Sequence, residues 1–173
     1  MNGDITTPDQ MGLHVEAIVN AANERLAAGS GVCGAIFAAA GRSELAGACR
    51  DLAPCPTGSA VSTPSFGLSA QGITWVIHAV GPDTRVFSLK ESTRLLEETY
   101  VSILAEAAAL GVRSLAVPSI STGIYGFPVD VAAQIAVTTI SQWQGLPDEV
   151  ALVAFDQDSA DVLTGAVATS IVK

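Results

Sequence analysis

Short apolar runs alternate with longer segments of helical periodicity along the chain from Ala17 onward. The expected strands are residues 17–23, 59–65, 75–80, 114–118 and 149–155. The expected helices are residues 35–40, 44–52, 88–110, 129–143 and 159–171. Because strands and helices that alternate in this way pack as a sheet with helices on both faces, the order predicts an α/β fold. We expect a three-layer α/β/α sandwich with a central mixed, mostly parallel sheet, in which Pro64 marks 59–65 as an edge strand.

The composition limits the function classes that the chain can belong to. Of its 173 residues, 49% are hydrophobic and 14% are charged, and no linker or repeat interrupts them. We therefore expect one domain over residues 1–173 with a sizeable core. The formal net charge is −9 and eight residues are Lys or Arg, so an extended nucleic-acid surface is not expected. No apolar stretch reaches the 18 residues that predict a membrane span.

The cysteines bear on the compartment and on metal binding. There are three, at positions 33, 49 and 55, and the chain starts without a recognisable export signal. An odd number of cysteines without such a signal predicts reduced thiols in a cytoplasmic protein. Their spacing fits no zinc pattern and neither histidine completes one, so we expect no metal. We also expect no cofactor, and a monomer.

The loop of residues 119–126 joins an expected strand to an expected helix. A loop in this place aims backbone N–H groups into a concavity, to which the nearby helix N-terminus adds partial positive charge. Gly123 can adopt a positive φ and has no side chain to block a phosphate, while Ser121 and Thr122 add hydroxyl donors. The alternative is a tight turn that binds nothing.

A second small-residue loop, residues 27–34, also leads into an expected helix. Gly29, Gly31 and Gly34 allow the close approach of a ligand. Residues 29–34 match the GxGxxG pattern, but they do not directly follow a first strand, so a dinucleotide-binding Rossmann unit is not favoured. Because both loops join strands to helices, we expect them at one edge of the sheet, as a site for a phosphate-rich nucleotide.

Several polar residues at strand ends have two interpretations. Asp4 is either a turn or cap residue, or an acceptor for an exocyclic amine. Asn20 is expected to brace loop backbone, whereas Asn23 lies nearer the strand end, where open α/β sheets place ligands. His78 lies inside an apolar strand, and we expect a hydrogen-bonded core histidine rather than a catalytic one.

Cys33 and Phe155 are similarly ambiguous. Cys33 stands at a helix start, where the helix dipole favours a nucleophilic thiolate, but no basic neighbour accompanies it, so a packing role is expected. Phe155 follows an apolar run, where an aromatic ring either stacks on a nucleobase or covers the rim of the core.

Six segments in order span nearly the whole chain: Gly-Asp-Ile-Thr at 3–6, Ile-Val-Asn-Ala-Ala-Asn at 18–23, Gly-x-Gly-Val at 29–32, Cys-Pro-Thr-Gly at 55–58, Val-Ile-His-Ala-Val-Gly-Pro at 76–82 and Pro-Ser-Ile-Ser-Thr-Gly-Ile-Tyr-Gly at 118–126. Together they resemble the macrodomain family of ADP-ribose-binding modules. The resemblance implies a mixed sheet between helices, with ADP-ribose lying across the strand ends.

The resemblance also implies which residues contact the ligand. Asp4 accepts from the adenine amine, the Ile5 backbone contacts the ring, and Phe155 stacks on or beside it. Asn23 contacts the distal ribose, with Tyr125 packed near it. The implied diphosphate contacts are Gly29, Ser30, Gly31 and Val32 on one side and Ser121, Thr122, Gly123, Ile124 and Tyr125 on the other.

One departure from the family pattern affects the expected chemistry. Many hydrolytic macrodomains have Asp ten residues after the equivalent of Asn23, whereas this chain has Cys33, with Phe37 four residues later. Some viral macrodomains that share the Gly-Val-Cys segment are nevertheless linked to removal of ADP-ribose. In such a site a substrate phosphate orients the attacking water, and catalysis comes from orientation rather than from a strong base.

The implied function is binding of ADP-ribose and hydrolysis of ADP-ribosyl linkages, as a mono-ADP-ribosyl hydrolase or an O-acyl-ADP-ribose deacylase. The predicted catalytic residues are Asn23, Gly31, Val32 and Cys33, and the implied partners are ADP-ribose and ADP-ribosylated protein or nucleic acid. The alternative is a non-catalytic module that reads ADP-ribose. A covalent role for Cys33 is a third hypothesis.

Overall fold

The computed structural model describes residues 1–171, within which five strands form one sheet. The strands are β1 (Ala17–Ala21), β2 (Ala60–Pro64), β3 (Trp75–Ala79), β4 (Ser114–Pro118) and β5 (Glu149–Val153). Their order across the sheet is β2-β3-β1-β4-β5. β2 runs antiparallel to β3 at one edge, and the other neighbouring pairs are parallel. The expected mixed, mostly parallel sheet is therefore confirmed, with the segment that contains Pro64 at its edge.

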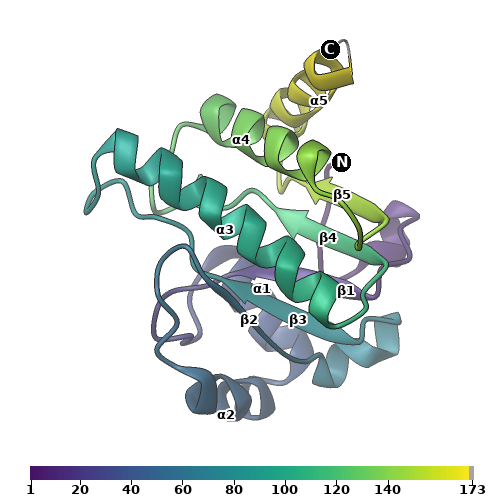
Figure 1. The fold of residues 1–173 in the computed structure, drawn as a ribbon. Coiled ribbons are helices and arrows are strands. Elements are labelled where there is room, and N and C mark those ends of the chain that lie inside the picture. Colours follow the sequence, from purple (N-terminus) through teal and green to yellow (C-terminus); the bar gives the residue numbers. More distant parts are fainter. Residues whose placement is uncertain (172–173) are drawn as a thin grey trace.

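Helices cover both faces of the sheet (Figure 1). α1 (Gly31–Ala40) and α2 (Arg42–Leu52) pack on one face, and α3 (Leu89–Ala109) and α4 (Val129–Gln142) pack on the other. α5 (Gln157–Ile171) packs beside α4, and two short 3₁₀ helices, Pro8–Met11 and Phe66–Gln71, lie between these elements. This arrangement confirms the three-layer sandwich.

The core follows from the alternation of side chains along each strand. Ile18 and Val76 point into the cluster under α1 and α2, whereas Val19 and Ile77 point into the cluster under α3 and α4. All four side chains are fully buried. Because successive strand residues face opposite sides, a continuous apolar run is what a strand covered on both faces requires.

Five boundaries differ by two residues or more from those expected, and two of these are the end of β1 at Ala21 rather than residue 23 and the start of α5 at Gln157 rather than residue 159. α1 begins at Gly31 rather than at residue 35, because glycine is a poor helix former and obscured the first turn in the sequence pattern. α2 begins at Arg42, two residues early. β5 ends at Val153, two residues early, because Ala154 instead bonds to the N-terminal segment through Met1 and Gly3.

The N-terminal segment lies beside the carboxyl end of β5. The Ala154 N–H donates to the Met1 carbonyl at 2.7 Å, and the Gly3 N–H donates to the Ala154 carbonyl at 2.9 Å. These bonds place Asp4 at the same sheet edge as the ends of β1 and β4. Within residues 1–171, no helix is both long and apolar enough to span a bilayer.

Candidate functional site

A cleft of about 700 Å³ opens at the carboxyl ends of β1, β4 and β5. Its wall contains every residue that the family resemblance implies as a ligand contact, together with Cys33. These residues are Asp4, Ile5, Asn23, Gly29, Ser30, Gly31, Val32, Cys33, Ser121, Thr122, Gly123, Ile124, Tyr125 and Phe155. The two small-residue loops thus lie at one sheet edge, as the order of elements predicts, while the roles of the individual residues stay predictions.

The 119–126 loop presents a run of free donors. The backbone N–H groups of residues 122–125 have no protein acceptor within the described part of the chain. The positive φ in this loop occurs at Ser121 (65°) and at Gly126 (67°), so Gly123 does not use the positive φ that it could adopt. The chain turns at Ser121 because its carbonyl must accept the Phe127 N–H at 3.0 Å. A Cβ at Gly123 would meet no atom within 4 Å, so this glycine keeps the cleft open.

Contacts with Thr84 and Gly81 hold this loop in place. Thr84 donates its N–H at 3.1 Å and its hydroxyl at 2.6 Å to the Tyr125 carbonyl. Gly81 packs beneath Ser121, since a Cβ at Gly81 would lie 2.3 Å from the Ser121 Oγ. That Oγ is buried and has no hydrogen-bond partner within residues 1–171, and an unpaired hydroxyl beside free N–H groups suits a ligand with several acceptor oxygens.

The 27–34 loop is braced by Asn23. The Asn23 Nδ2 donates to the Ala27 carbonyl at 2.8 Å, and the Ala27 N–H donates to the Asn23 Oδ1 at 3.2 Å. Gly34 does not approach a ligand, because a Cβ there would lie 2.7 Å from the Gly29 carbonyl oxygen. Its lack of a side chain lets the loop fold back on α1.

The N-terminus of α1 supplies a second set of donors. Ser30 is the N-cap residue of α1 and has an extended backbone, but its side chain accepts no hydrogen bond from the first turn. The Ser30 side chain therefore leaves the first N–H groups of the helix without a cap. Gly31 has a positive φ of 59°, which a side chain would strain. Cys33 is buried, and its Sγ lies 3.8 Å from the Ala27 carbonyl oxygen. The thiol therefore packs against the loop that it follows.

Asn20 and His78 belong to the core and not to the cleft. The Asn20 Nδ2 lies 3.0 Å from His78 Nδ1, and the Thr63 Oγ1 lies 3.0 Å from His78 Nε2. Burial lowers the pKa of His78 to about 4, so the ring is neutral at pH 7. The core role of His78 is confirmed. Asn20 does not brace loop backbone as expected, because it sits opposite His78 in the parallel register of β1 and β3.

The outer end of the cleft carries Asp4, Phe155 and Ile124. The Phe155 side chain is 90% exposed and Ile124 is 66% exposed, which is unusual for apolar residues in a cleft wall. Asp4 forms a turn in which its Oδ1 accepts the Thr6 N–H at 2.9 Å and the Thr6 hydroxyl at 2.7 Å. The turn role expected for Asp4 is present, and its Oδ2 accepts no hydrogen bond from the described residues.

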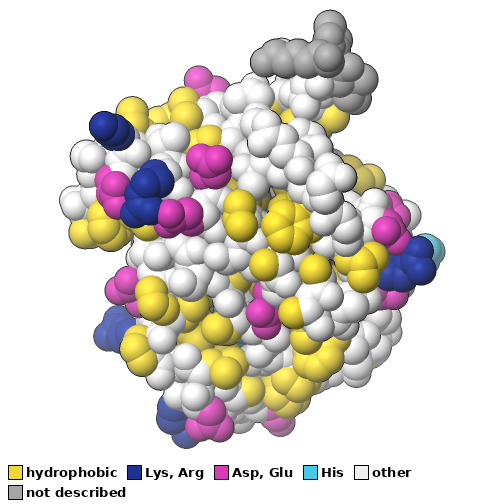
Figure 2. Space-filling view, in the orientation of Figure 1, with side chains coloured by type: hydrophobic (Ala, Val, Ile, Leu, Met, Phe, Trp, Pro, Cys, Tyr) yellow, Lys and Arg dark blue, Asp and Glu magenta, His cyan; other side chains and the backbone are white. Residues whose placement is uncertain are grey.

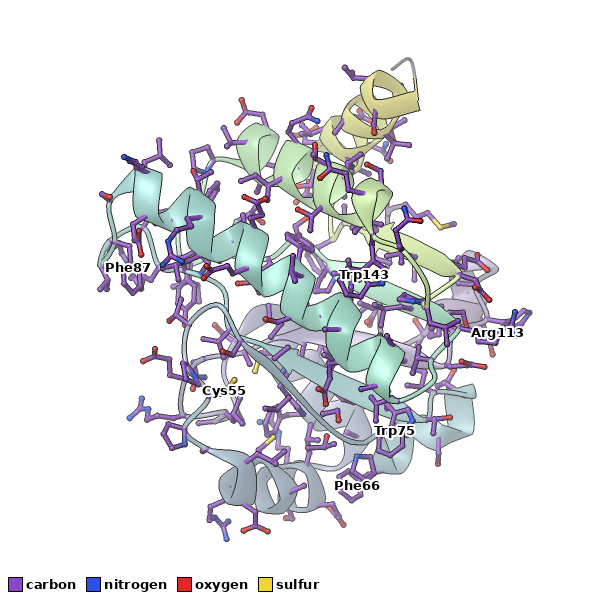
Figure 3. The ribbon with its side chains drawn as sticks, in the orientation of Figure 1. Cys55, Phe66, Trp75, Phe87, Arg113 and Trp143 are labelled. Carbon is purple, nitrogen blue, oxygen red and sulfur yellow. The ribbon has the colours of Figure 1, made fainter. Side chains whose placement is uncertain are left out.

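Within residues 1–171, no Lys or Arg side chain lines the cleft. Its charged wall residues are Asp4 and Asp156. Arg113, labelled in Figure 3, lies just before β4 at the opposite end of that strand and pairs with Asp148 at 2.6 Å. On the face in Figure 2, Lys and Arg side chains appear as separate spots and not as a patch. A bound anion would therefore depend on backbone N–H groups and hydroxyls.

Tyr125 adds a neutral phenol to the wall. Burial, together with the nearby Asp83 carboxylate, raises the pKa of Tyr125 above its ordinary value. The hydroxyl is therefore protonated at pH 7 and can donate a hydrogen bond.

Known proteins resemble this chain in sequence and in fold. A family model described as Macro domain matches residues 19–136. A protein of Salmonella gallinarum named O-acetyl-ADP-ribose deacetylase is 46% identical, over 92% of this chain and 88% of its own length. A variant of the Oceanobacillus iheyensis macrodomain, solved with ADPR, is 34% identical with a TM-score of 0.89, over 99% of this chain and 92% of that one. The Trypanosoma brucei macrodomain in complex with ADP-ribose is 32% identical with a TM-score of 0.80, over 96% of this chain and 67% of that one.

Proposed function

This chain belongs to the Macro domain family, and from that premise we propose that it binds ADP-ribose across the ends of β1, β4 and β5 and hydrolyses O-acyl-ADP-ribose. The observation that carries the proposal is that two sets of backbone N–H groups face one cleft, which no Lys or Arg side chain of residues 1–171 lines. One set is the free N–H groups of residues 122–125, and the other is the start of α1. A diphosphate placed between them would accept from both.

The nucleobase end of the ligand would lie beside Asp4 and Phe155. Asp4 follows Gly3, Phe155 follows Ala154, and the Gly3 N–H donates to the Ala154 carbonyl at the end of β5. Asp4 and Phe155 both line the cleft. Stacking of a base on the exposed Phe155 ring would favour binding. The Ile5 N–H has no acceptor within residues 1–171 and can donate to the base.

Phe155→Ala is expected to weaken ADP-ribose binding about tenfold, because stacking of one base on an aromatic ring is worth about 1–3 kcal/mol. The side chain is 90% exposed, so the free energy of unfolding should change little. Calorimetric titration with ADP-ribose measures the loss, and titration with ribose 5-phosphate, which lacks the base, serves as the control. An unchanged Kd for ADP-ribose would remove Phe155 from the site.

We propose a deacylation that uses no strong protein base, because the carboxylates that line the cleft within residues 1–171 are Asp4 and Asp156. The charged wall residues, Asp4 and Asp156, lie at the end of β5, and position 33 holds a thiol packed on Ala27. We propose that a substrate phosphate and the cleft N–H groups orient the water that attacks the acyl carbonyl. The ester C–O bond then breaks, the ribose oxygen leaves with a proton from that water, and the carboxylic acid and ADP-ribose are released. The first N–H groups of α1, from Gly31 and Val32, are donors of the kind that stabilises an oxyanion.

Asn23 has a positioning role in this proposal that its contacts support. Each end of its amide makes one bond to Ala27, which leaves one N–H and one lone pair for the distal ribose. Asn23 would thus contact the ligand and fix the 27–34 loop at the same time.

Asn23→Ala is expected to lower kcat/KM for O-acetyl-ADP-ribose by about 10–100-fold, because small misplacements of an oriented site are costly. Product release followed by chromatography measures the rate. Cys33→Ala is the matched variant on the same loop, and its full activity would exclude a covalent thiol. Equal rates for the wild type and Asn23→Ala would contradict the mechanism.

A second function, a module that reads ADP-ribose without cleaving it, is favoured by the absence of a carboxylate at position 33. The two functions differ in turnover and not in affinity. Incubation with O-acetyl-ADP-ribose and with mono-ADP-ribosylated protein and nucleic acid distinguishes them. Tight binding of ADP-ribose with no cleavage of any of these linkages would favour the reader.

A further inference from the structure

We infer that Thr84 is a positioning residue that holds the 119–126 loop in the orientation in which the N–H groups of residues 122–125 face the phosphates of a ligand. The inference rests on the proposed function, since it concerns the same cleft. Thr84 lies between β3 and α3, is half-buried and does not line the cleft. It therefore acts on a ligand only through the loop.

Two donors of Thr84 converge on one carbonyl oxygen of this loop. The Thr84 N–H and hydroxyl lie 3.1 Å and 2.6 Å from the carbonyl oxygen of Tyr125, which is 41 residues away in the chain. Two donors occupy both lone pairs of that oxygen and so fix the direction of the carbonyl. Because a peptide group is planar, the N–H of Gly126 in the same peptide group is fixed with it.

The loop also closes on this peptide group from inside. The Gly126 N–H donates to the Gly123 carbonyl at 3.0 Å, and the Phe127 N–H donates to the Ser121 carbonyl at 3.0 Å. These bonds join neighbouring residues to one another, so they fix the shape of the loop but not its tilt against the sheet. The two bonds from Thr84 come from another segment and fix that tilt. The segments are in close contact, since a Cβ at Gly126 would lie 3.3 Å from the Thr84 Oγ1.

The tilt of the loop decides where its free donors point. The N–H groups of residues 122–125 have no acceptor within residues 1–171, so their direction depends on the position of the loop. Donors that already point into the cleft bind a diphosphate without an ordering cost. When only a fraction of the molecules holds the donors in this way, the Kd rises in inverse proportion to that fraction. Loss of the Thr84 hydroxyl should therefore weaken ligands that contain phosphate and spare a ligand that lacks it.

The test measures the Kd of ADP-ribose and ADP by calorimetry, and that of adenosine by NMR titration, which reaches weak binding. Thr84→Val removes the hydroxyl and keeps the shape of the side chain. It should raise the Kd of ADP-ribose and of ADP about fivefold and leave that of adenosine within about twofold of the wild type. Thr84→Ser keeps the hydroxyl and should restore the wild-type values. If chemical denaturation shows that Thr84→Val does not fold, Thr84→Ala gives the same comparison.

Thr93→Val is the matched control, because the Thr93 hydroxyl also donates to a backbone carbonyl, that of Leu89 at 2.9 Å, but within α3 and away from the cleft wall. It should leave all three Kd values unchanged. If the variants without the Thr84 hydroxyl bind ADP-ribose and ADP as the wild type does, or lose adenosine to the same extent, the inference is wrong. If the wild type binds neither ADP-ribose nor ADP, the proposed function itself fails.

Discussion

The Gly123→Glu variant is expected to lose at least about 100-fold in affinity for ADP-ribose while it keeps the stability of the wild type. A Cβ at Gly123 meets no atom within 4 Å and φ is not positive there, so the folded chain accepts a side chain. The new carboxylate lies among the free N–H groups of residues 122–125, where it competes with the diphosphate and repels it. None of the Lys and Arg side chains in the described part of the chain lines the cleft to offset the repulsion. A 100-fold loss corresponds to about 2.7 kcal/mol, which is a modest cost for opposed charges in a partly enclosed site.

The control for this variant is a glutamate elsewhere in the chain. Gly47, in α2, also has open space around its Cβ position and no positive φ, and it is not part of the cleft wall. Gly47→Glu adds the same charge to the same protein and should bind ADP-ribose as the wild type does. Calorimetry gives both affinities, and chemical denaturation shows that both variants fold. Equal losses in the two variants would mean that net charge, and not the cradle of N–H groups, controls affinity.

The sequence predicted the layers and the location of the cleft because these depend on local patterns. Apolar runs such as 75–80 must be strands covered on both faces, and a loop between such a strand and a helix falls at the edge where ligands bind. The side chains that line that edge, from Asp4 to Phe155, could thus be chosen from their place in the chain and from the family resemblance.

The remaining details depend on contacts between segments that are distant in the chain. Ser121 adopts the positive φ because Phe127 and Gly81 constrain it, and neither constraint is visible in the octapeptide. The pairing of Asn20 with His78 depends on the register of two parallel strands that are 58 residues apart. The beginning of α1 was placed too late because glycines serve both the turn and the first helical residues. Propensity patterns cannot decide such cases, in which tertiary contacts determine the local conformation.

The pH dependence of stability is expected to show a loss of up to about 3 kcal/mol between pH 7 and pH 4 that originates from His78. Burial lowers the pKa of His78 from its ordinary value of 6.5 to about 4. Between these values the unfolded chain binds a proton that the folded protein does not bind, so the unfolded state is stabilised relative to the folded state as the pH falls. Above pH 6.5 the His78 contribution is constant, and below pH 4 both states are protonated and no further loss arises from it.

His78→Gln removes the titrating group and keeps a side chain that can bond to Asn20 and Thr63, so its unfolding free energy should be flatter over this range than that of the wild type. His14→Gln is the matched control, because His14 is exposed and lies beside Asp9 at the surface rather than in the core, and it should keep the wild-type slope. Urea denaturation at half-unit steps of pH gives the three curves. If His78→Gln does not fold, NMR titration of the His78 ring in the wild type still measures the pH at which the ring takes up its proton. The buried ring should stay neutral down to pH 5, and a ring that takes up its proton near pH 6.5 would show that burial between β2 and β1 does not exclude the charge.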